Sequence, residues 1–321
     1  MKKTALTVLG WLISIALLVA LAWGWDWAKT WASLSATNFW FIIAAVILNF
    51  VVVALKSVRW QWLLTDRKTH FMTMFKAQVI GMAGNNVMPA RGGDWYRIYL
   101  LGKWEKISKA ALTSITGLDK LFDGIAILAL FALASMHSTF PEWVRSSTMI
   151  VTGVIIGGLI ICILFRIHHR RNVDIPKTRR GRISQLIYQL GAGMSIMEEK
   201  GKFGATLVLS FVIAVLQIAT LLTVQKAFGI ILPLWVPVLV YVAINLAIIV
   251  PSAPSNIGPF EVAAVLAYTW QGLTKEVAFN IAFIYHVVQV IPVTLLGLYY
   301  YLTTFRHHHL KAGKRVSTSS S

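Results

Sequence analysis

A short polar stretch, AGNNVMPARGGDWYR, lies between two apolar segments and runs from Ala83 to Arg97. In this stretch Pro89 ends the incoming helix, and Gly92 and Gly93 permit a turn. A helix that restarts inside a membrane has free N–H groups at its beginning. Those groups, together with the helix dipole, favour an anion such as phosphate. The stretch therefore predicts a broken helix that can bind a phosphate group.

Side chains around this break supply further groups for a ligand. Asn85 and Asn86 can hydrogen-bond open backbone or ligand, and Arg91 offers a bidentate fork of donors. A charge at the bilayer centre costs at least about 2.5–3.5 kcal/mol, so it is seldom kept without a function. The alternative is that Arg91 pairs with Asp94 and only holds the turn together. Arg97 lies one helical turn further along and is predicted near the inner interface, where its side chain would snorkel.

A second break, VPSAPSNIG, interrupts a later apolar region. Pro251 and Pro254 are its helix breakers, and Asn256, Gly258 and Glu261 are candidate substrate-binding residues. Because a proline opens the next helix, Glu261 occupies the third helical position. A carboxylate there suits helix capping as well as ligand binding, so both roles stay open.

The stretch TGLDKLFDG holds a third group of charges inside an apolar span. Asp119 and Asp123 are four residues apart, so they share a helix face about 14 Å into the span, while Lys120 is rotated by about 100°. These side chains are predicted either to bind substrate or to form a structural network. Buried acids without a partner tend to be protonated, which leaves room for proton coupling. His286, in the last span, is predicted to be a packing residue with satisfied hydrogen bonds, and the alternative is a ligand or proton relay.

Composition places all these residues in a membrane protein. Of the 321 residues, 57% are hydrophobic and 13% are charged, and the apolar runs of about 20 residues match the hydrocarbon core. The net charge of +18 arises from basic residues in loops, as the positive-inside rule produces, so no nucleic-acid partner is expected. The basic loops instead predict contact with anionic lipid headgroups at the cytoplasmic face.

The apolar pattern predicts an all-α protein with six transmembrane helices and two re-entrant hairpins. The hairpins are 70–82 followed by 94–102, and 235–249 followed by 259–271; thirteen helical residues reach about 20 Å, only to mid-bilayer. The predicted full spans are 5–25, 38–56, 110–136, 148–166, 203–226 and 277–303.

Basic residues fix the predicted orientation. With the N-terminus inside, four basic residues lie outside and two, Arg91 and Lys120, lie at depth, which leaves 24 of the 30 on the inner side. Both termini are then cytoplasmic, and the membrane is predicted to be a bacterial inner membrane. The four outside residues are Lys29, Arg145, Lys226 and Lys275.

This order of elements repeats with opposite orientation. Residues 38–136 and 203–303 each read as span, hairpin, span, within a single membrane domain of residues 1–303. The segment 166–202 is the predicted basic cytoplasmic linker, and its part 183–202 reads as an amphipathic surface helix. Residues 304–321 are predicted to form a basic, disordered cytoplasmic tail.

No catalytic or metal-binding motif occurs in the sequence. GxSxG, HExxH, Walker and metal-spaced His/Cys patterns are missing, and the HHH at 307–309 lies in the basic tail. The single cysteine, Cys162, lies in an apolar run. We therefore expect no enzymatic activity, no cofactor and no bound metal. The sequence leaves the oligomeric state open, with a homo-oligomer allowed.

The two breaks resemble those of the flippase-like family related to the membrane region of lysylphosphatidylglycerol synthases. NNVMPARGGDWYRIYLL and VPSAPSNIGPFEVAAVLAY carry the likeness, and SVRWQWLL, residues 57–64, is similar to the arginine-containing end of an early span in that family. The likeness covers about residues 5–303. The family often has paired glycines where this chain has Ser255 and Asn256; asparagine tolerates a left-handed turn and serine does so less.

The resemblance implies translocation of a lipid between leaflets. Its implied substrates are aminoacylated phospholipids and polyprenyl- or hopanoid-linked lipids. We therefore expect a lipid translocase whose midplane cavity holds a phosphate headgroup through Arg91 and the helix starts. Two other classes stay open: a small-solute or ion transporter whose acids coordinate a cation, and a non-transporting membrane partner of a glycosyltransferase or lipid-modifying enzyme.

Overall fold

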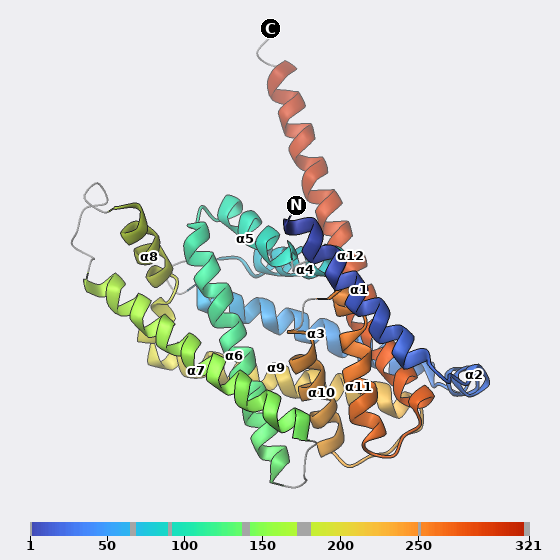
Figure 1. Cartoon of the computed structure of the whole chain (residues 1–321). Coiled ribbons are helices and arrows are strands. Elements are labelled where there is room, and N and C mark those ends of the chain that lie inside the picture. The colour runs from blue at the N-terminus through green and yellow to red at the C-terminus, as the bar shows by residue number, and fades with distance from the viewer. Residues whose placement is uncertain are drawn as a thin grey trace.

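The protein is helical throughout the residues that the computed structural model describes, which are 2–64, 69–88, 92–136, 142–171, 181–249 and 252–317 (Figure 1). No strand occurs in these ranges, so the all-α prediction is confirmed. The α-helices are α1 Lys2–Ala22, α2 Trp27–Ser35, α3 Phe39–Leu63, α4 Phe71–Val87, α5 Gly92–Trp104, α6 Lys109–Ser135, α7 Glu142–Arg171, α8 Arg182–Ala192, α9 Lys200–Ala227, α10 Trp235–Ala247, α11 Pro259–Thr269 and α12 Lys275–Ser317.

Four helices are long and apolar enough to cross a membrane: α3, α7, α9 and the Lys275–Thr304 part of α12. A fifth span results if α1 and α2, which meet at an angle of 93°, count as one. Helix α6 has the length of a span but carries four charged residues, Lys109 at its beginning and Asp119, Lys120 and Asp123 further along. The chain is thus a polytopic membrane protein with four or five candidate spans, and six spans stay a prediction.

Both predicted breaks separate short helices. Helix α4 ends at Val87 and α5 begins at Gly92, while α10 ends at Ala247 and α11 begins at Pro259. A short 3-10 turn, η4 Pro254–Asn256, lies inside the second break. The first break is shorter than predicted, because α4 continues through Asn85 and Asn86 instead of ending at residue 82.

Two predicted boundaries differ from the structure because charged residues continue a helix. The span predicted at 38–56 extends to Leu63 in α3, since ion pairs accommodate Arg59 inside the protein. Helix α12 extends to Ser317, where the sequence predicts a disordered tail from residue 304. Lysine, arginine, leucine and alanine have high helix propensity, which is consistent with this extension.

In the described part of the basic linker, residues 181–199 form two short helical elements. Helix α8 packs against α6 and α7, and the 3-10 helix η3, Ser195–Glu198, precedes α9. Arg166 of α7 donates from Nε to Glu198 Oε1 at 2.8 Å, and this hydrogen bond lowers the pKa of Glu198. This bond attaches the linker to the end of α7 that is predicted to face the cytoplasm.

The helix contacts in the first half of the chain match those in the second half when each helix is replaced by its counterpart. Helix α3 packs on α9, its counterpart in the second half. Contacts of α4 with α5, α3 and α12 correspond to contacts of α10 with α11, α9 and α6. Contacts of α6 with α3, α5 and α9 correspond in the same way to contacts of α12 with α9, α11 and α3. The exchange relates α3 to α9, α4 to α10, α5 to α11 and α6 to α12.

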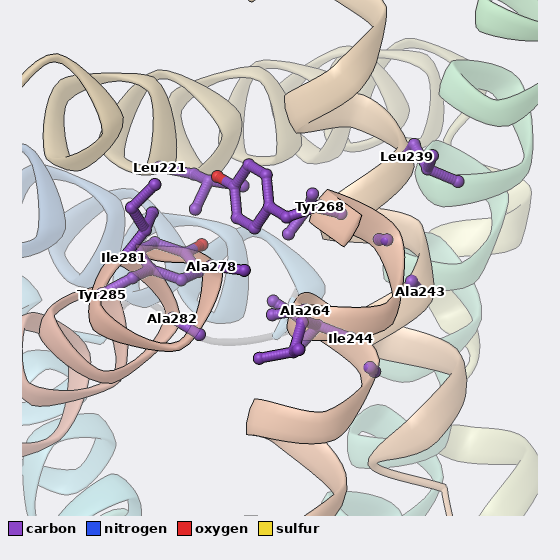
Figure 2. Close-up of a cluster of buried hydrophobic side chains, with 14 of the residues drawn as sticks. Leu221, Leu239, Ala243, Ile244, Ala264, Tyr268, Ala278, Ile281, Ala282 and Tyr285 are labelled. Carbon is purple, nitrogen blue, oxygen red and sulfur yellow. The ribbon is translucent and has the colours of Figure 1, made fainter. Parts of the chain in front are cut away.

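Two apolar clusters support the two breaks. One joins α9, α10, α11 and α12 and includes the fully buried Tyr268 together with several alanines (Figure 2). Small residues at these contacts allow helices to approach closely. The other cluster joins the end of α3 to α4, α5 and α6 around Trp60 and Phe122. Each broken pair is therefore packed against full-length helices.

Close backbone contact holds α4 against α5. A Cβ atom built on Gly93 would lie 1.9 Å from the carbonyl oxygen of Gly81 and 2.4 Å from the amide nitrogen of Asn85. A Cβ atom on Gly84 would lie 2.8 Å from Gly93 Cα. These distances leave no room for a side chain, so glycine at position 93 is a steric requirement of the hairpin.

We predict that Gly93→Ala destabilises the protein by about 1–3 kcal/mol, because the added methyl group must separate α4 from α5. Thermal unfolding of the purified protein in detergent measures this effect. Gly153→Ala in α7 is the matched control, since nothing lies within 4 Å of a Cβ atom there, and it should be neutral or stabilising by up to about 1 kcal/mol. Equal melting temperatures for the two variants would contradict the close packing.

Candidate functional site

The first break is closed by a reciprocal pair of hydrogen bonds. Asn85 Nδ2 donates to Asp94 Oδ1 at 3.0 Å, and the Asp94 amide donates to Asn85 Oδ1 at 3.1 Å. The second bond satisfies one of the N–H groups in the first turn of α5 that have no intrahelical partner. Asn85 and Asp94 thus have a structural role as well as their predicted binding role.

Arg97 is buried directly behind this pair. Its guanidinium lies 3.9 Å from the centre of the Trp60 ring, Nη1 donates to Gln78 Oε1, and Nη2 is 3.7 Å from Asp94 Oδ1. Only 3% of the residue is exposed. The predicted snorkelling of Arg97 is not seen, because the side chain stacks on Trp60 within the protein. Its position near the inner interface stays a prediction. Among the described residues, Nε and Nη2 have no hydrogen-bond partner.

The second break is capped by Glu261. Its Oε2 accepts a hydrogen bond from the Gly258 amide at 2.7 Å, and its Oε1 contacts His286 Nδ1 of α12 at 2.5 Å. Of the two roles left open for Glu261, the capping role is the one visible in the geometry. His286 is more than a packing residue, since its other nitrogen, Nε2, lies 2.9 Å from the carbonyl oxygen of Ser255.

Three residues of the second break have left-handed backbone. Ser255 has φ 61°, Asn256 has φ 60° and Gly258 has φ 99°. The paired positions where the resembled family often has glycine are therefore left-handed here too. Serine is strained in this conformation by about 1–3 kcal/mol. Such strain persists where surrounding contacts fix the backbone, and Ser255 makes several.

The two breaks touch each other. Ser255 Oγ donates to the Asn86 carbonyl oxygen at 3.2 Å, which joins η4 to the end of α4. Asn86 Nδ2 also donates to Thr294 Oγ1 of α12 at 2.9 Å. On the other side of the second break, Ser14 Oγ of α1 accepts from the Ala253 amide at 3.0 Å. Residues distant in the sequence thus bring α1, α4, η4 and α12 together at one place.

A separate ion cluster links α3, α6 and α9. Arg59 of α3 lies 2.7 Å from Asp119 Oδ1 and 2.7 Å from Asp123 Oδ1, and its Nη1 also donates to Ser210 Oγ at 2.9 Å. Asp119 and Asp123 share a helix face, as their spacing predicts. Lys120 is exposed on a different face.

Sequence reasoning overlooked Arg59 as a site residue, although the segment SVRWQWLL contains it. An arginine in an otherwise apolar span was the signal that could have found it. Its contact with both aspartates favours the structural reading of that group. Three predicted residues, Pro89, Arg91 and Pro251, lie outside the described residues.

An apolar groove of about 530 Å³ is lined by α1, α11 and the turn that leads into α12. Leu17 and Leu21 of α1 face Val262 and Val265 of α11 across it, and Lys275 lies at the beginning of α12. Leu266, also part of its lining, is 50% exposed, so the groove is at the surface of the protein. Its volume falls within the range of about 300–1,000 Å³ that small-molecule sites usually have.

Residues 7–297 match the family model described as the lysylphosphatidylglycerol synthase TM region. The chain belongs to this family. The breaks and their arrangement described above fall wholly within the matched residues. The match supports the family resemblance seen in the sequence.

Curated relatives are similar over much of the chain. A UPF0104 membrane protein of Methanothermobacter thermautotrophicus is 23% identical over 272 residues, covering 74% of this chain and 78% of the relative. The UPF0104 membrane protein MJ1595 of Methanocaldococcus jannaschii is 23% identical, covering 98% of each chain. Glycosyltransferase AglD of Haloferax volcanii is 24% identical over 298 residues, covering 80% of this chain but 47% of AglD.

We predict that Arg59→Gln destabilises the protein by about 3–5 kcal/mol, since Asp119 would remain buried and both aspartates would lose the cation that contacts them. Thermal unfolding measures the change, and adding Asp119→Asn and Asp123→Asn should recover part of the stability. Arg166→Gln, which removes the partly exposed pair with Glu198, should cost at most about 1 kcal/mol. The cluster would lose its structural role if Arg59→Gln cost no more than this control.

Proposed function

We propose that this protein moves a phosphate-bearing amphipathic lipid between the leaflets of the cytoplasmic membrane. The observation that carries this proposal is the contact between the two breaks through Ser255 and Asn86. The first break also holds the buried Arg97, and two of its nitrogens have no hydrogen-bond partner among the described residues. Buried guanidinium donors and the free N–H groups of a helix start suit a phosphate. We propose no enzymatic activity for the chain.

The proposed architecture has six spans, the sixth being α6, and two hairpins that enter the membrane from opposite faces. Helices α10 and α11, of 13 and 11 residues, would be about 20 Å and 17 Å long, too short to cross the hydrocarbon core alone. The exchange of contacts between the halves of the chain supports an inverted repeat, which in transporters places the site between the repeats. In Figure 1 the beginning of α1 and the end of α12 both lie toward the upper part of the view, which supports termini on one side of the membrane.

In the proposed site, Arg91 and the beginning of α5 hold the phosphate, and Asn85, Asn86, Asp94 and Arg97 shape the pocket. The second break contributes Asn256, Gly258 and Glu261 from the opposite side. The acyl part would lie in the groove between α1 and α11, whose lining is apolar. A small polar solute would gain little from such a groove, so the groove favours a lipid over a solute or ion.

The membrane proposed here is the cytoplasmic one, with both termini inside. The sequence predicts a bacterial inner membrane, whereas the relatives named above come from archaea. The linker and tail would contact anionic headgroups at the inner face. A homo-oligomer is compatible with the proposal.

A second candidate function is support of a glycosyltransferase without transport. The observation that favours it is the similarity to part of a protein named Glycosyltransferase AglD. In this alternative the chain would hold a lipid-linked substrate near an enzyme. Transport by the purified protein alone separates the two candidates.

Cysteine labelling tests the proposed topology. In a Cys162→Ser background, Thr274→Cys should react with an impermeant maleimide added to intact cells, because the turn before α12 would be outside. A cysteine at Lys311 should react only after the membrane is opened. Equal accessibility of the two positions would contradict the proposed orientation.

Leaflet exchange tests the function. Purified protein in phosphatidylglycerol vesicles should speed the exchange of NBD-labelled phosphatidylglycerol, followed by quenching of outer-leaflet probe with dithionite. Arg91→Ala should lower the exchange rate by at least about tenfold, the equivalent of one lost charge-assisted hydrogen bond, and Arg145→Ala, on the predicted outer side, should leave it unchanged.

Undiminished exchange by Arg91→Ala would remove Arg91 from the mechanism. No exchange by folded wild-type protein, together with loss of a glycan or lipid product in cells lacking it, would favour the glycosyltransferase partner instead.

A further inference from the structure

His286 lies where both of its ring nitrogens face hydrogen-bond acceptors. Nδ1 is 2.5 Å from Glu261 Oε1, and Nε2 is 2.9 Å from the Ser255 carbonyl oxygen. A backbone carbonyl only accepts, so Nε2 must carry a proton to bond to it. The neutral ring then has a lone pair on Nδ1, directed at the carboxylate.

The short contact between Nδ1 and Oε1 therefore requires one more proton. With a carboxylate and an unprotonated Nδ1, two acceptors would face each other at 2.5 Å, which is repulsive. A proton on either atom turns that contact into a hydrogen bond, and the pair as a whole is then neutral. His286 is 7% exposed and Glu261 is 3% exposed, so bulk water does not lie between Nδ1 and Oε1 in place of this hydrogen bond.

We propose that Glu261 and His286 form a proton-binding site that controls the contact between the two breaks. The structure corresponds to the occupied site. The inference rests on the proposed function in one respect: it makes the proton the coupling ion of the proposed lipid translocase. Its physical basis is the hydrogen-bond geometry alone.

The connection from this proton to the first break is short and continuous. The His286 ring holds the Ser255 carbonyl, and Ser255 Oγ holds the Asn86 carbonyl at the end of α4. Ser255 and Asn256 are held in left-handed backbone, which serine adopts only at a cost. Loss of the proton leaves one ring proton for two acceptors. On Nδ1 this proton bonds the carboxylate, so Nε2 no longer donates to the Ser255 carbonyl and the strained turn is released from α4.

Glu261 is the charged group that the described contacts place against the imidazole. The Phe260 ring of α11 stacks on it with centroids 4.2 Å apart. The neighbouring elements α1 and α4 contribute the uncharged Ser14 and Asn86 to the same junction. The charge at this junction is therefore set by how many protons Glu261 and His286 hold between them.

The test measures the distance between the breaks and the protonation of His286 in the same protein without any transport assay. Spin labels replace Val87 and Ile257, which flank the breaks and are 66% and 38% exposed, in a Cys162→Ser background. Electron–electron resonance gives their separation, and ¹⁵N NMR follows the imidazole of His286, assigned by its absence in His286→Gln.

We expect one short separation at mildly acidic pH and a second, longer one that grows as pH rises, with the same midpoint as the change in the His286 ¹⁵N signals. His286→Gln keeps a donor near the Ser255 carbonyl and His286→Asn keeps one near Glu261, but neither binds the proton, so both should lose the pH response. His169→Gln, at a histidine bonded to the Tyr188 carbonyl, should keep it.

Three results would overturn the inference: His286 ¹⁵N signals that do not change with pH in the folded protein, signals that change while the separation stays constant, or a pH response that persists in His286→Gln. If these three measurements come out as expected but the vesicles show no lipid exchange, the translocase function would be contradicted and the proton site would still be supported.

Discussion

The backbone of a membrane protein must satisfy its polar groups without help from water, and this constraint governs the molecule described here. Wherever a helix stops inside a hydrocarbon layer, its open N–H and C=O groups need partners from the protein. In this chain each break is capped by its own residues, and a hydrogen bond joins the two breaks. Asn85 caps the beginning of α5, Glu261 caps the beginning of α11, and Ser255 bridges to Asn86.

The same requirement explains why so many side chains at the junction are small or polar. Gly93 allows α5 to lie against α4, and a Cβ on Gly10 of α1 would lie 2.9 Å from the Ser252 carbonyl oxygen at the second break. At this junction the buried Glu261 is paired with His286. A protein that only needed to be stable could replace such groups by apolar residues. Their retention fits a site at which polar contacts are made and broken.

Much of the fold could be predicted from the sequence because apolar run length and helix breakers act locally. The four candidate spans and both helices of the second break follow from those signals. Helix ends at charged residues could not be predicted, because Arg59 stays inside α3 only through partners on α6 and α9. The burial of Arg97 could not be predicted for the same reason, because it depends on Trp60, which lies on another helix.

The site was predicted in outline and missed in its connections. Proline, glycine and asparagine patterns identified both breaks, and the spacing of Asp119 and Asp123 gave their shared face. The bond from Ser255 to Asn86 and the pairing of Glu261 with His286 join residues 169 and 25 positions apart. No local pattern encodes such contacts. They arise from tertiary packing, which is also why a histidine that reads as a packing residue turns out to link two elements.

The central claim is that both breaks lie together near the middle of the bilayer. Fluorophores attached at Val87 and at Ile257, one at a time, in vesicles of lipids brominated at different depths, test it most directly. The account predicts that both are quenched most strongly by bromines near the ends of the acyl chains. Strongest quenching of either fluorophore by bromines near the headgroups would place that break at the surface and contradict the account.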